Sequence, residues 1–246
     1  LASSDQFRRS DYIIRKWRGL AIMEILLDTG NLEDIKKYSR IYNIVGVTTN
    51  PTIVSREHTE FFPLLYKIKE IIGNGQLHVQ VTADTWEEMV KEAKCVLGQI
   101  DKDVYIKVPT TEIGVRAMKE LKQKGVHVTA TAIYTPQQAM VAASVGADYV
   151  APYFNRMNNL NVDSAKAVAD IARLYDIHSQ PTKILTASFK NTQQIMEAMM
   201  AGSHAVTVPT ELLTDMVKNA IIDFAVEGFH KDWVDTYGDK KIYELL

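Results

Sequence analysis

The stretch Asp-Val-Tyr-Ile-Lys-Val-Pro-Thr at residues 103–110 places a lysine inside an apolar run that is typical of a β-strand. Val104, Ile106 and Val108 are β-branched, and the following proline cannot continue a hydrogen-bonded ladder, so we expect a short buried strand. Lys107 lies near its end. A buried amine loses part of its charge and becomes a nucleophile toward carbonyl groups. The alternative is a lysine whose stem is buried and whose ammonium reaches solvent.

Composition limits the classes of protein to consider. The chain has 246 residues, 46% of them hydrophobic, which suits one large α/β domain with a sizeable core. A formal net charge of −2 provides no basic face for nucleic acid and no polybasic membrane anchor. No apolar run approaches the ~20 residues that span a bilayer. The one cysteine, Cys95, excludes an internal disulfide and is expected to act as a small hydrophobic residue. We expect a cytoplasmic protein.

Residues 1–22 differ from the rest of the chain. They are rich in Ser and Arg, they show little apolar periodicity, and Met23 directly precedes the first strand pattern. We therefore interpret residues 1–22 as an N-terminal extension outside the fold, and residues 23–246 as a single domain.

From Met23 onward, apolar β patterns alternate with segments of helical spacing. The expected strands are residues 24–28, 44–48, 77–82, 104–109, 126–131, 148–152, 183–188 and 205–208. Asn31, Asp84, Thr135 and Asn191 stand where the N-caps of the intervening helices should be. Eight β/α units without a linker predict a (β/α)8 barrel, the TIM barrel, with a doubly wound open sheet as the rival fold.

A barrel would gather polar residues from different units at one mouth, because its active site forms at the carboxyl ends of the strands. Asp28 could instead cap the following helix, and Asn50-Pro51 is typical of a turn. Tyr153 could be a packed aromatic and Arg156 a surface ion-pair partner. The polar residues at these ends are Asp28, Thr48, Thr49, Asn50, Gln80, Lys107, Thr129, Thr131, Tyr153, Asn155, Arg156, Ser188 and Lys190.

Five motifs, in this order and spacing, resemble the small transaldolase-like family of class I aldolases. They are Ile-Leu-Leu-Asp-Thr at 25–29, Gly-Val-Thr-Thr-Asn-Pro at 46–51, Tyr-Ile-Lys-Val-Pro at 105–109, Ala-Pro-Tyr-Phe-Asn-Arg at 151–156 and Ala-Ser-Phe-Lys at 187–190. The resemblance is closest to the fructose-6-phosphate aldolases, which are similar to this chain in having Gln at position 80 and Tyr at position 153. Transaldolases usually carry Glu and Phe there. The resemblance implies a (β/α)8 barrel of the class I aldolase type that needs no metal and no cofactor.

The resemblance also implies roles for individual residues. Lys107 matches the lysine that forms a Schiff base with a ketone, and Asp28 matches the carboxylate that handles substrate hydroxyls and proton transfers. Lys190 falls where many transaldolases carry arginine, and a lysine offers a point charge in place of a bidentate fork. The positions that match substrate and phosphate binding are Thr48, Asn50, Arg156, Ser188 and Lys190.

Carbon–carbon cleavage beside a ketone also needs a group that moves protons. Tyr153 is our candidate acid/base, acting directly or through a water held by Gln80 and Thr131. Our leading hypothesis is an aldolase that reversibly cleaves fructose 6-phosphate to dihydroxyacetone and glyceraldehyde 3-phosphate. The second is a transaldolase that passes the dihydroxyacetone unit between sugar phosphates, as in the pentose phosphate pathway. The third is a barrel that binds sugar phosphates without turnover.

The histidines give little support to a metal site. The six are scattered along the chain without ligand spacing. His78 and His127 fall in or next to strands, and we expect them to face the helix layer.

The end of the chain extends beyond the expected barrel. The last expected helix covers residues 212–226, and residues 229–246 then place Trp233, Tyr237, Ile242 and Tyr243 between charged residues. We expect this segment to pack on a neighbouring subunit, because exposed aromatic patches mark interaction surfaces. The resemblance implies a homo-oligomer, a ring-shaped pentamer or a decamer. The alternative is a helix folded back on its own barrel.

Overall fold

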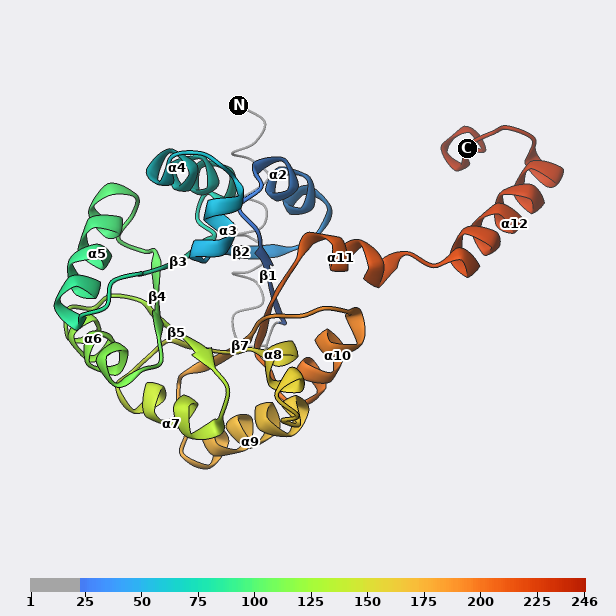
Figure 1. Ribbon diagram of the computed structural model, residues 1–246. Coiled ribbons are helices and arrows are strands. Elements are labelled where there is room, and N and C mark those ends of the chain that lie inside the picture. Colours follow the sequence, from blue (N-terminus) through green and yellow to red (C-terminus); the bar gives the residue numbers. More distant parts are fainter. Residues whose placement is uncertain (1–22) are drawn as a thin grey trace.

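The computed structural model describes residues 23–246, so the extension expected at residues 1–22 lies outside the described part of the chain. Eight parallel strands close into a barrel in chain order, from β1 to β8, and β8 pairs with β1. Helices surround the strands as an outer ring (Figure 1). The expected (β/α)8 barrel is confirmed, and the open sheet is not the fold.

The strands follow the apolar patterns of the sequence closely. Three coincide with the expected ranges: β1 (Glu24–Asp28), β2 (Ile44–Thr48) and β8 (Ala205–Val208). The others differ by no more than two residues at either end. They are β3 (Gln76–Gln80), β4 (Tyr105–Pro109), β5 (Val128–Ile133), β6 (Tyr149–Pro152) and β7 (Lys183–Thr186).

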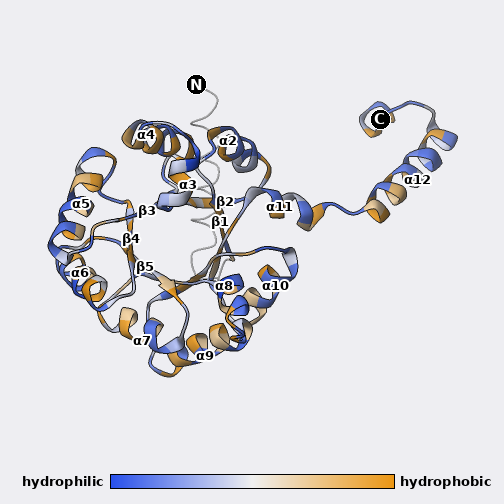
Figure 2. Ribbon diagram, viewed as in Figure 1, coloured by the Kyte–Doolittle hydropathy of each residue, from blue (hydrophilic) through white to orange (hydrophobic). Residues whose placement is uncertain are grey.

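The ring helices bury one face each against the strands, and both apolar and polar residues are visible on them in Figure 2. The main core lies between the two layers, and Leu27, Ile106 and Met118 are among its fully buried members. The barrel interior is filled by a separate set of side chains, which point inward from the strands. The ring consists of α2 (Leu32–Ile41), α4 (Phe61–Ile72), α5 (Trp86–Gln99), α6 (Glu112–Gln123), α7 (Pro136–Ser144), α9 (Ser164–Ile177), α10 (Thr192–Met200) and α11 (Thr210–Val217).

Most of the expected caps begin their helices. The side chains of Asn31 and Asn191 accept hydrogen bonds from the backbone three residues on, and Thr135 forms a complete capping box. The expectation for Asp84 is wrong, because the cap of α5 is its neighbour Thr85, whose hydroxyl accepts from the backbone of the third residue after it.

Two short helices at the barrel mouth were not expected from the sequence. Asn50 begins α3 (Pro51–Arg56), where its Oδ1 accepts from the backbone of Ile53 at 3.0 Å and the proline occupies the first turn. The Asn-Pro pair therefore starts a helix and not a simple turn. Directly after β6, α8 (Phe154–Asn159) carries Arg156. Both helices bring candidate site residues to the carboxyl ends of the strands.

The sequence predicted one continuous helix at residues 212–226, and that prediction is wrong. The segment divides into α11 and α12 (Ala220–Tyr237), with Lys218 in an extended conformation between them. The helix α12 projects away from the barrel (Figure 1), and Ile221, Phe224 and Phe229 are 72 to 77% exposed. It is followed by the short helix η1 (Ile242–Glu244). The structure does not show the fold-back alternative, and packing on a neighbour stays a prediction. None of the helices in residues 23–246 could cross a membrane.

Candidate active site

Lys107 points into the barrel from β4, and only 5% of its surface is exposed. Its Nζ donates a 2.7 Å hydrogen bond to the backbone oxygen of Thr49. Burial lowers the pKa of Lys107 because it penalises the ammonium form, and the charge of Asp28 opposes this shift. The lysine therefore does not extend its charge into solvent at the strand end, which was the alternative. It is a buried amine whose ammonium form is destabilised by burial.

Asp28 ends β1 beside this lysine. Its Oδ1 accepts a 2.7 Å hydrogen bond from Thr48 on β2, and the Thr48 oxygen also lies 2.6 Å from that of Thr207 on β8. Burial raises the pKa of Asp28, and Lys107 is the strongest of the groups that lower it again. Asp28 does not cap α2, since Asn31 does. A carboxylate with a raised pKa beside an amine with a lowered one is typical of a site that exchanges protons.

Tyr153 follows β6 and shares a 2.9 Å hydrogen bond with Thr131 on β5. Burial raises the pKa of Tyr153, so its phenol is protonated at neutral pH. The Arg156 guanidinium lies over the ring, 4.8 Å from its centroid. Tyr134 packs on the same ring edge-on at 5.7 Å and hydrogen bonds to Arg156, which raises the pKa of that guanidinium. Within residues 23–246 no ion pair engages Arg156, so it is not the surface salt-bridge partner considered as an alternative.

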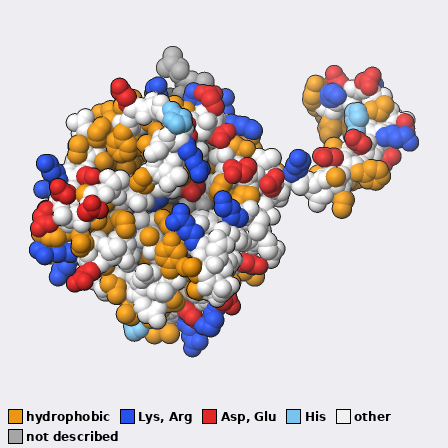
Figure 3. All heavy atoms as spheres, viewed as in Figure 1, with side chains coloured by type: hydrophobic (Ala, Val, Ile, Leu, Met, Phe, Trp, Pro, Cys, Tyr) orange, Lys and Arg blue, Asp and Glu red, His pale blue; other side chains and the backbone are white. Residues whose placement is uncertain are grey.

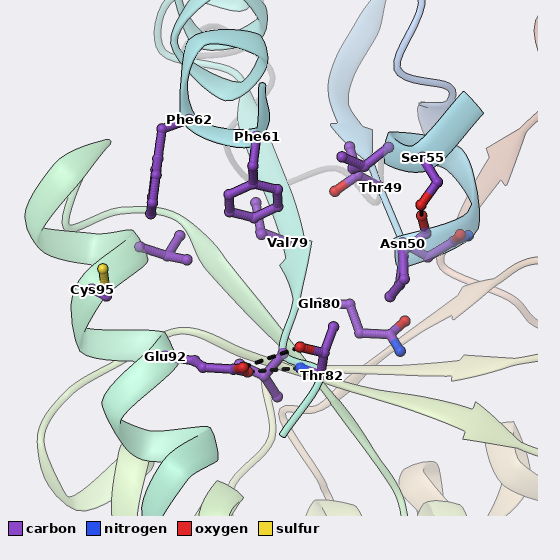
Figure 4. A pocket seen from close by; sticks show the side chains of 14 residues that line it. Thr49, Asn50, Ser55, Phe61, Phe62, Val79, Gln80, Thr82, Glu92 and Cys95 are labelled. Carbon is purple, nitrogen blue, oxygen red and sulfur yellow. Dashed lines mark hydrogen bonds between the residues drawn. The ribbon is translucent and has the colours of Figure 1, made fainter. Parts of the chain in front are cut away.

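A pocket of about 440 Å³ opens beside the mouth, between the ends of β2 and β3 and the helices α4 and α5. Gln80 and Asn50 line it on the side of the strands, and Phe61 and Phe62 line it on the side of α4 (Figure 4). Gln80 is the register partner of Lys107, and its amide makes no hydrogen bond to any described residue. The amide is therefore available to a substrate or a water. Cys95 also lines this pocket and is exposed, so it is not packed as a small hydrophobic residue.

The ends of β6 and β7 lie side by side and carry the expected phosphate ligands. An isolated bridge joins Tyr153 to Ala187, and the backbone nitrogen of Asn155 donates to the carbonyl of Ser188 at 2.9 Å. Ser188 has a φ of +65°, a left-handed conformation that non-glycine residues seldom adopt and that is common at functional sites. Lys190 is exposed just beyond it. Lys and Arg side chains stand near the centre of the face seen in Figure 3.

Two groups at the site, Thr207 and Tyr134, were missed by sequence reasoning, and Thr49 was expected at the mouth without its contact to Lys107. Thr49 binds Lys107 through its main chain, which leaves no signal in the sequence. Thr207 and Tyr134 left a weak one, since each is a polar residue at or near the end of an apolar strand. Elsewhere in residues 23–246, no three His, Cys, Asp or Glu side chains gather as metal ligands would.

Comparison with known proteins identifies the family of this chain. A family profile described as transaldolase/fructose-6-phosphate aldolase matches residues 25–239. A probable fructose-6-phosphate aldolase of Streptococcus pneumoniae is 46% identical over 213 residues, which cover 86% of this chain and 96% of the relative. A probable transaldolase of Thermoanaerobacter sp. is 34% identical over 211 residues, 86% of this chain and 97% of the relative. One of Clostridium botulinum is 33% identical over 219 residues, 89% of this chain and all of the relative. The chain therefore belongs to the transaldolase/fructose-6-phosphate aldolase family of enzymes.

Proposed function

We propose that the protein is a class I aldolase that reversibly cleaves fructose 6-phosphate to dihydroxyacetone and glyceraldehyde 3-phosphate through a Schiff base on Lys107. The observation that carries this proposal is the buried amine of Lys107, held on the carbonyl of Thr49 with its pKa lowered by desolvation. A lowered pKa increases the fraction of neutral amine, which is the form that attacks a ketone.

The reaction begins when the neutral Nζ of Lys107 attacks the C2 carbonyl of the sugar. Protonation of the resulting carbinolamine hydroxyl releases water and leaves an iminium, which acts as the electron sink. The raised pKa of Asp28 suits it to give and take protons at this stage, since it lies beside Lys107 and is held by Thr48.

Cleavage then removes the proton from the C4 hydroxyl, breaks the C3–C4 bond and leaves an enamine on Lys107. We assign this proton to Tyr153, which first gives its phenol proton to the carbinolamine hydroxyl that leaves as water. The resulting phenolate then accepts the C4 proton, directly or through a water positioned by Gln80 and Thr131. The 2.9 Å bond from Thr131 to Tyr153 supports that assignment. Protonation of the enamine carbon and addition of water to the iminium release dihydroxyacetone and restore the amine.

The remaining polar residues would bind the rest of the substrate. Thr48 at the end of β2 and Asn50 at the start of α3 would contact the sugar hydroxyls. Arg156, Ser188 and Lys190 would hold the phosphate, because two cations and a hydroxyl from adjacent units suit an anion. The partner implied is thus a small sugar phosphate.

The second candidate is a transaldolase, favoured by the relatives of 33 and 34% identity that carry that name. In that case the enamine would persist on Lys107 until it attacked the carbonyl of an aldose phosphate acceptor. Gln80 and Tyr153 favour the aldolase, because a site that protonates the enamine efficiently releases free dihydroxyacetone.

Borohydride reduction in the presence of fructose 6-phosphate, followed by peptide mapping, tests the proposal. We expect a mass increase on Lys107, none in Lys107→Met, and acceptor-free cleavage in a coupled assay that EDTA leaves unchanged. Strict dependence on an added acceptor would support the transaldolase. Protection by the sugar phosphate in a thermal melt without any adduct would identify a binding module and refute both enzymatic proposals.

A further inference from the structure

At the level of Lys107 and below it, the barrel interior holds a buried polar cluster that the proposed mechanism does not use. His78 on β3 is fully buried, with Nδ1 2.9 Å from the Thr129 hydroxyl on β5 and Nε2 3.1 Å from the Gln76 side-chain oxygen. The expectation that His78 faces the helix layer is therefore wrong. Apolar branched side chains usually fill such an interior, so a hydrogen-bonded imidazole needs an explanation.

The hydrogen bonds of the cluster determine which nitrogen of the imidazole carries the proton. The Gln76 amide nitrogen donates to the Tyr149 hydroxyl at 3.2 Å, and that hydroxyl donates to Glu24 at 2.7 Å. The Gln76 oxygen, which faces His78, can only accept. In the neutral ring Nε2 must then carry the hydrogen, and Nδ1 accepts from Thr129.

The ring is also held from its sides. Tyr105 stacks on it at 4.6 Å, and Tyr149 meets it edge-on at 5.5 Å. Burial keeps the pKa of His78 well below its ordinary value, and the nearby charge of Lys107 adds to this effect. The imidazole is therefore neutral at neutral pH, and its orientation is fixed by contacts on both nitrogens and on its faces.

Strand register places the His78–Thr129 bond directly below the candidate acid/base groups. Lys107 pairs with Gln80 on one side and with Thr129 on the other. Because side chains on one face of a strand recur every two residues, His78 lies one inward position below Gln80, and Thr129 one below Thr131. The bond thus joins β3 to β5 across β4, one inward position below Gln80 and Thr131.

We infer that His78 and Thr129 are positioning residues of the reaction proposed above: their hydrogen bond sets the spacing of β3 and β5, the two strands beside Lys107, and so positions Gln80 and Thr131 at the carboxyl ends of those strands. The inference rests on the proposed function. In this view the bond affects proton transfer, because Gln80 and Thr131 hold the water and Tyr153. It should affect the attack of the amine less, because neither His78 nor Thr129 binds Lys107 or its partner Thr49.

The test compares isosteric variants in the full-length protein with fructose 6-phosphate as substrate. Thr129→Val removes the hydroxyl and keeps the shape, and Thr129→Ser keeps the hydroxyl. We expect Thr129→Val to lower kcat for cleavage by about tenfold or more with KM and borohydride labelling of Lys107 changed less than about twofold, because a positioned acid/base contributes ~10²–10⁴ in rate. Thr129→Ser should restore most of kcat. Thr186→Val is the matched control, because it removes a buried hydroxyl on β7 that is bonded to Ser203 in the loop before β8.

A double-variant cycle distinguishes the effect on kcat of losing the His78–Thr129 bond from the effect of a general loss of packing. His78→Phe should lower kcat as Thr129→Val does, and the double variant should be no worse than either, because both changes break one bond. Additive losses of kcat in the double variant, or an unchanged kcat in Thr129→Val, would overturn the positioning role. Labelling of Lys107 in the parent protein would still support the proposed function in that case. A parent protein that forms no adduct at Lys107 would refute the proposed function and this role together.

Discussion

Thr131 on β5 and Tyr153 at the end of β6 join their hydroxyl groups in a 2.9 Å hydrogen bond. The bond holds the phenol in place between two strands, and the Arg156 guanidinium covers the ring from the outside. Burial raises the pKa of Tyr153, so the group is a proton donor over the neutral range. Removing its oxygen alone should therefore separate proton transfer from binding.

We expect Tyr153→Phe to lower acceptor-free cleavage of fructose 6-phosphate by ~10²–10⁴, the usual contribution of a positioned acid/base. Transfer to an added aldose phosphate should fall less, because the ring and its contact with Arg156 remain. A coupled assay with and without acceptor measures both. Tyr175→Phe is the control, since it removes a buried phenol that donates to Ala139 in the helix layer. Equal cleavage rates in Tyr153→Phe and the parent would contradict the role.

The pH dependence of Schiff-base formation should report the pairing of Asp28 with Lys107. Attack requires the neutral amine, so the initial rate of borohydride labelling should rise with pH around a midpoint below the ordinary lysine value of 10.5. The negative charge of Asp28 raises the pKa of Lys107. Asp28→Asn removes that charge and should move the midpoint to lower pH, even where the maximal rate falls.

Asp148→Asn provides the comparison for this pH experiment. Asp148 accepts from Lys122 and from the backbone of Val128 at the opposite end of the barrel. Its removal should leave the midpoint of labelling unchanged. A midpoint that moves to higher pH in Asp28→Asn would show that the carboxylate does not stabilise the ammonium of Lys107.

Arg156 should distinguish phosphorylated from unphosphorylated substrates. We expect Arg156→Met to lower kcat/KM for fructose 6-phosphate by about 10- to 100-fold, as expected for loss of a charge-assisted hydrogen bond of ~1.5–3 kcal/mol. Condensation of unphosphorylated aldehydes should change little. Lys190→Met should have the smaller effect, because an exposed lysine offers only a point charge. Arg116→Met is a matched control, since Arg116 also stacks on an aromatic ring, 4.1 Å from the centroid of Trp86, but on α6.

Much of this architecture could be predicted from the sequence because its patterns are local. The run around Lys107 combines β-branched residues with a terminal proline, and the caps at Asn31 and Thr135 lie beside the helices that they begin. Convergence of strand ends then followed from the closed barrel alone. The structure places Asp28, Lys107 and Tyr153 at the same mouth for that reason.

Other features depend on contacts that no local pattern encodes. The carbonyl of Thr49 binds Lys107 although any residue there would supply one. His78 occurs in an alternating strand, and alternation does not say which face is the barrel interior when both faces are buried. The break between α11 and α12 falls within a continuous helical pattern, where tertiary context decides whether the helix continues.

The projecting helix α12 leads to a prediction about assembly. Its apolar residues Ile221, Phe224 and Phe229 are largely exposed, and the described part of the chain offers them no partner within one barrel. We expect this helix to pack on a neighbouring subunit in a pentamer or decamer, because apolar surface of this kind is seldom left in water. Light scattering should give a multiple of the 27.7 kDa chain mass.

Aspartate substitutions at this surface test whether α12 holds the assembly together. Phe224→Asp combined with Phe229→Asp should shift the particle toward the mass of one chain, since a charge cannot be buried without a partner. Met200→Asp on α10 is the control: Met200 is 83% exposed on the barrel itself, and its replacement should leave the mass unchanged. A parent protein that scatters as one chain would reject the assembly, and an intact oligomer in the double variant would show that α12 is not its interface.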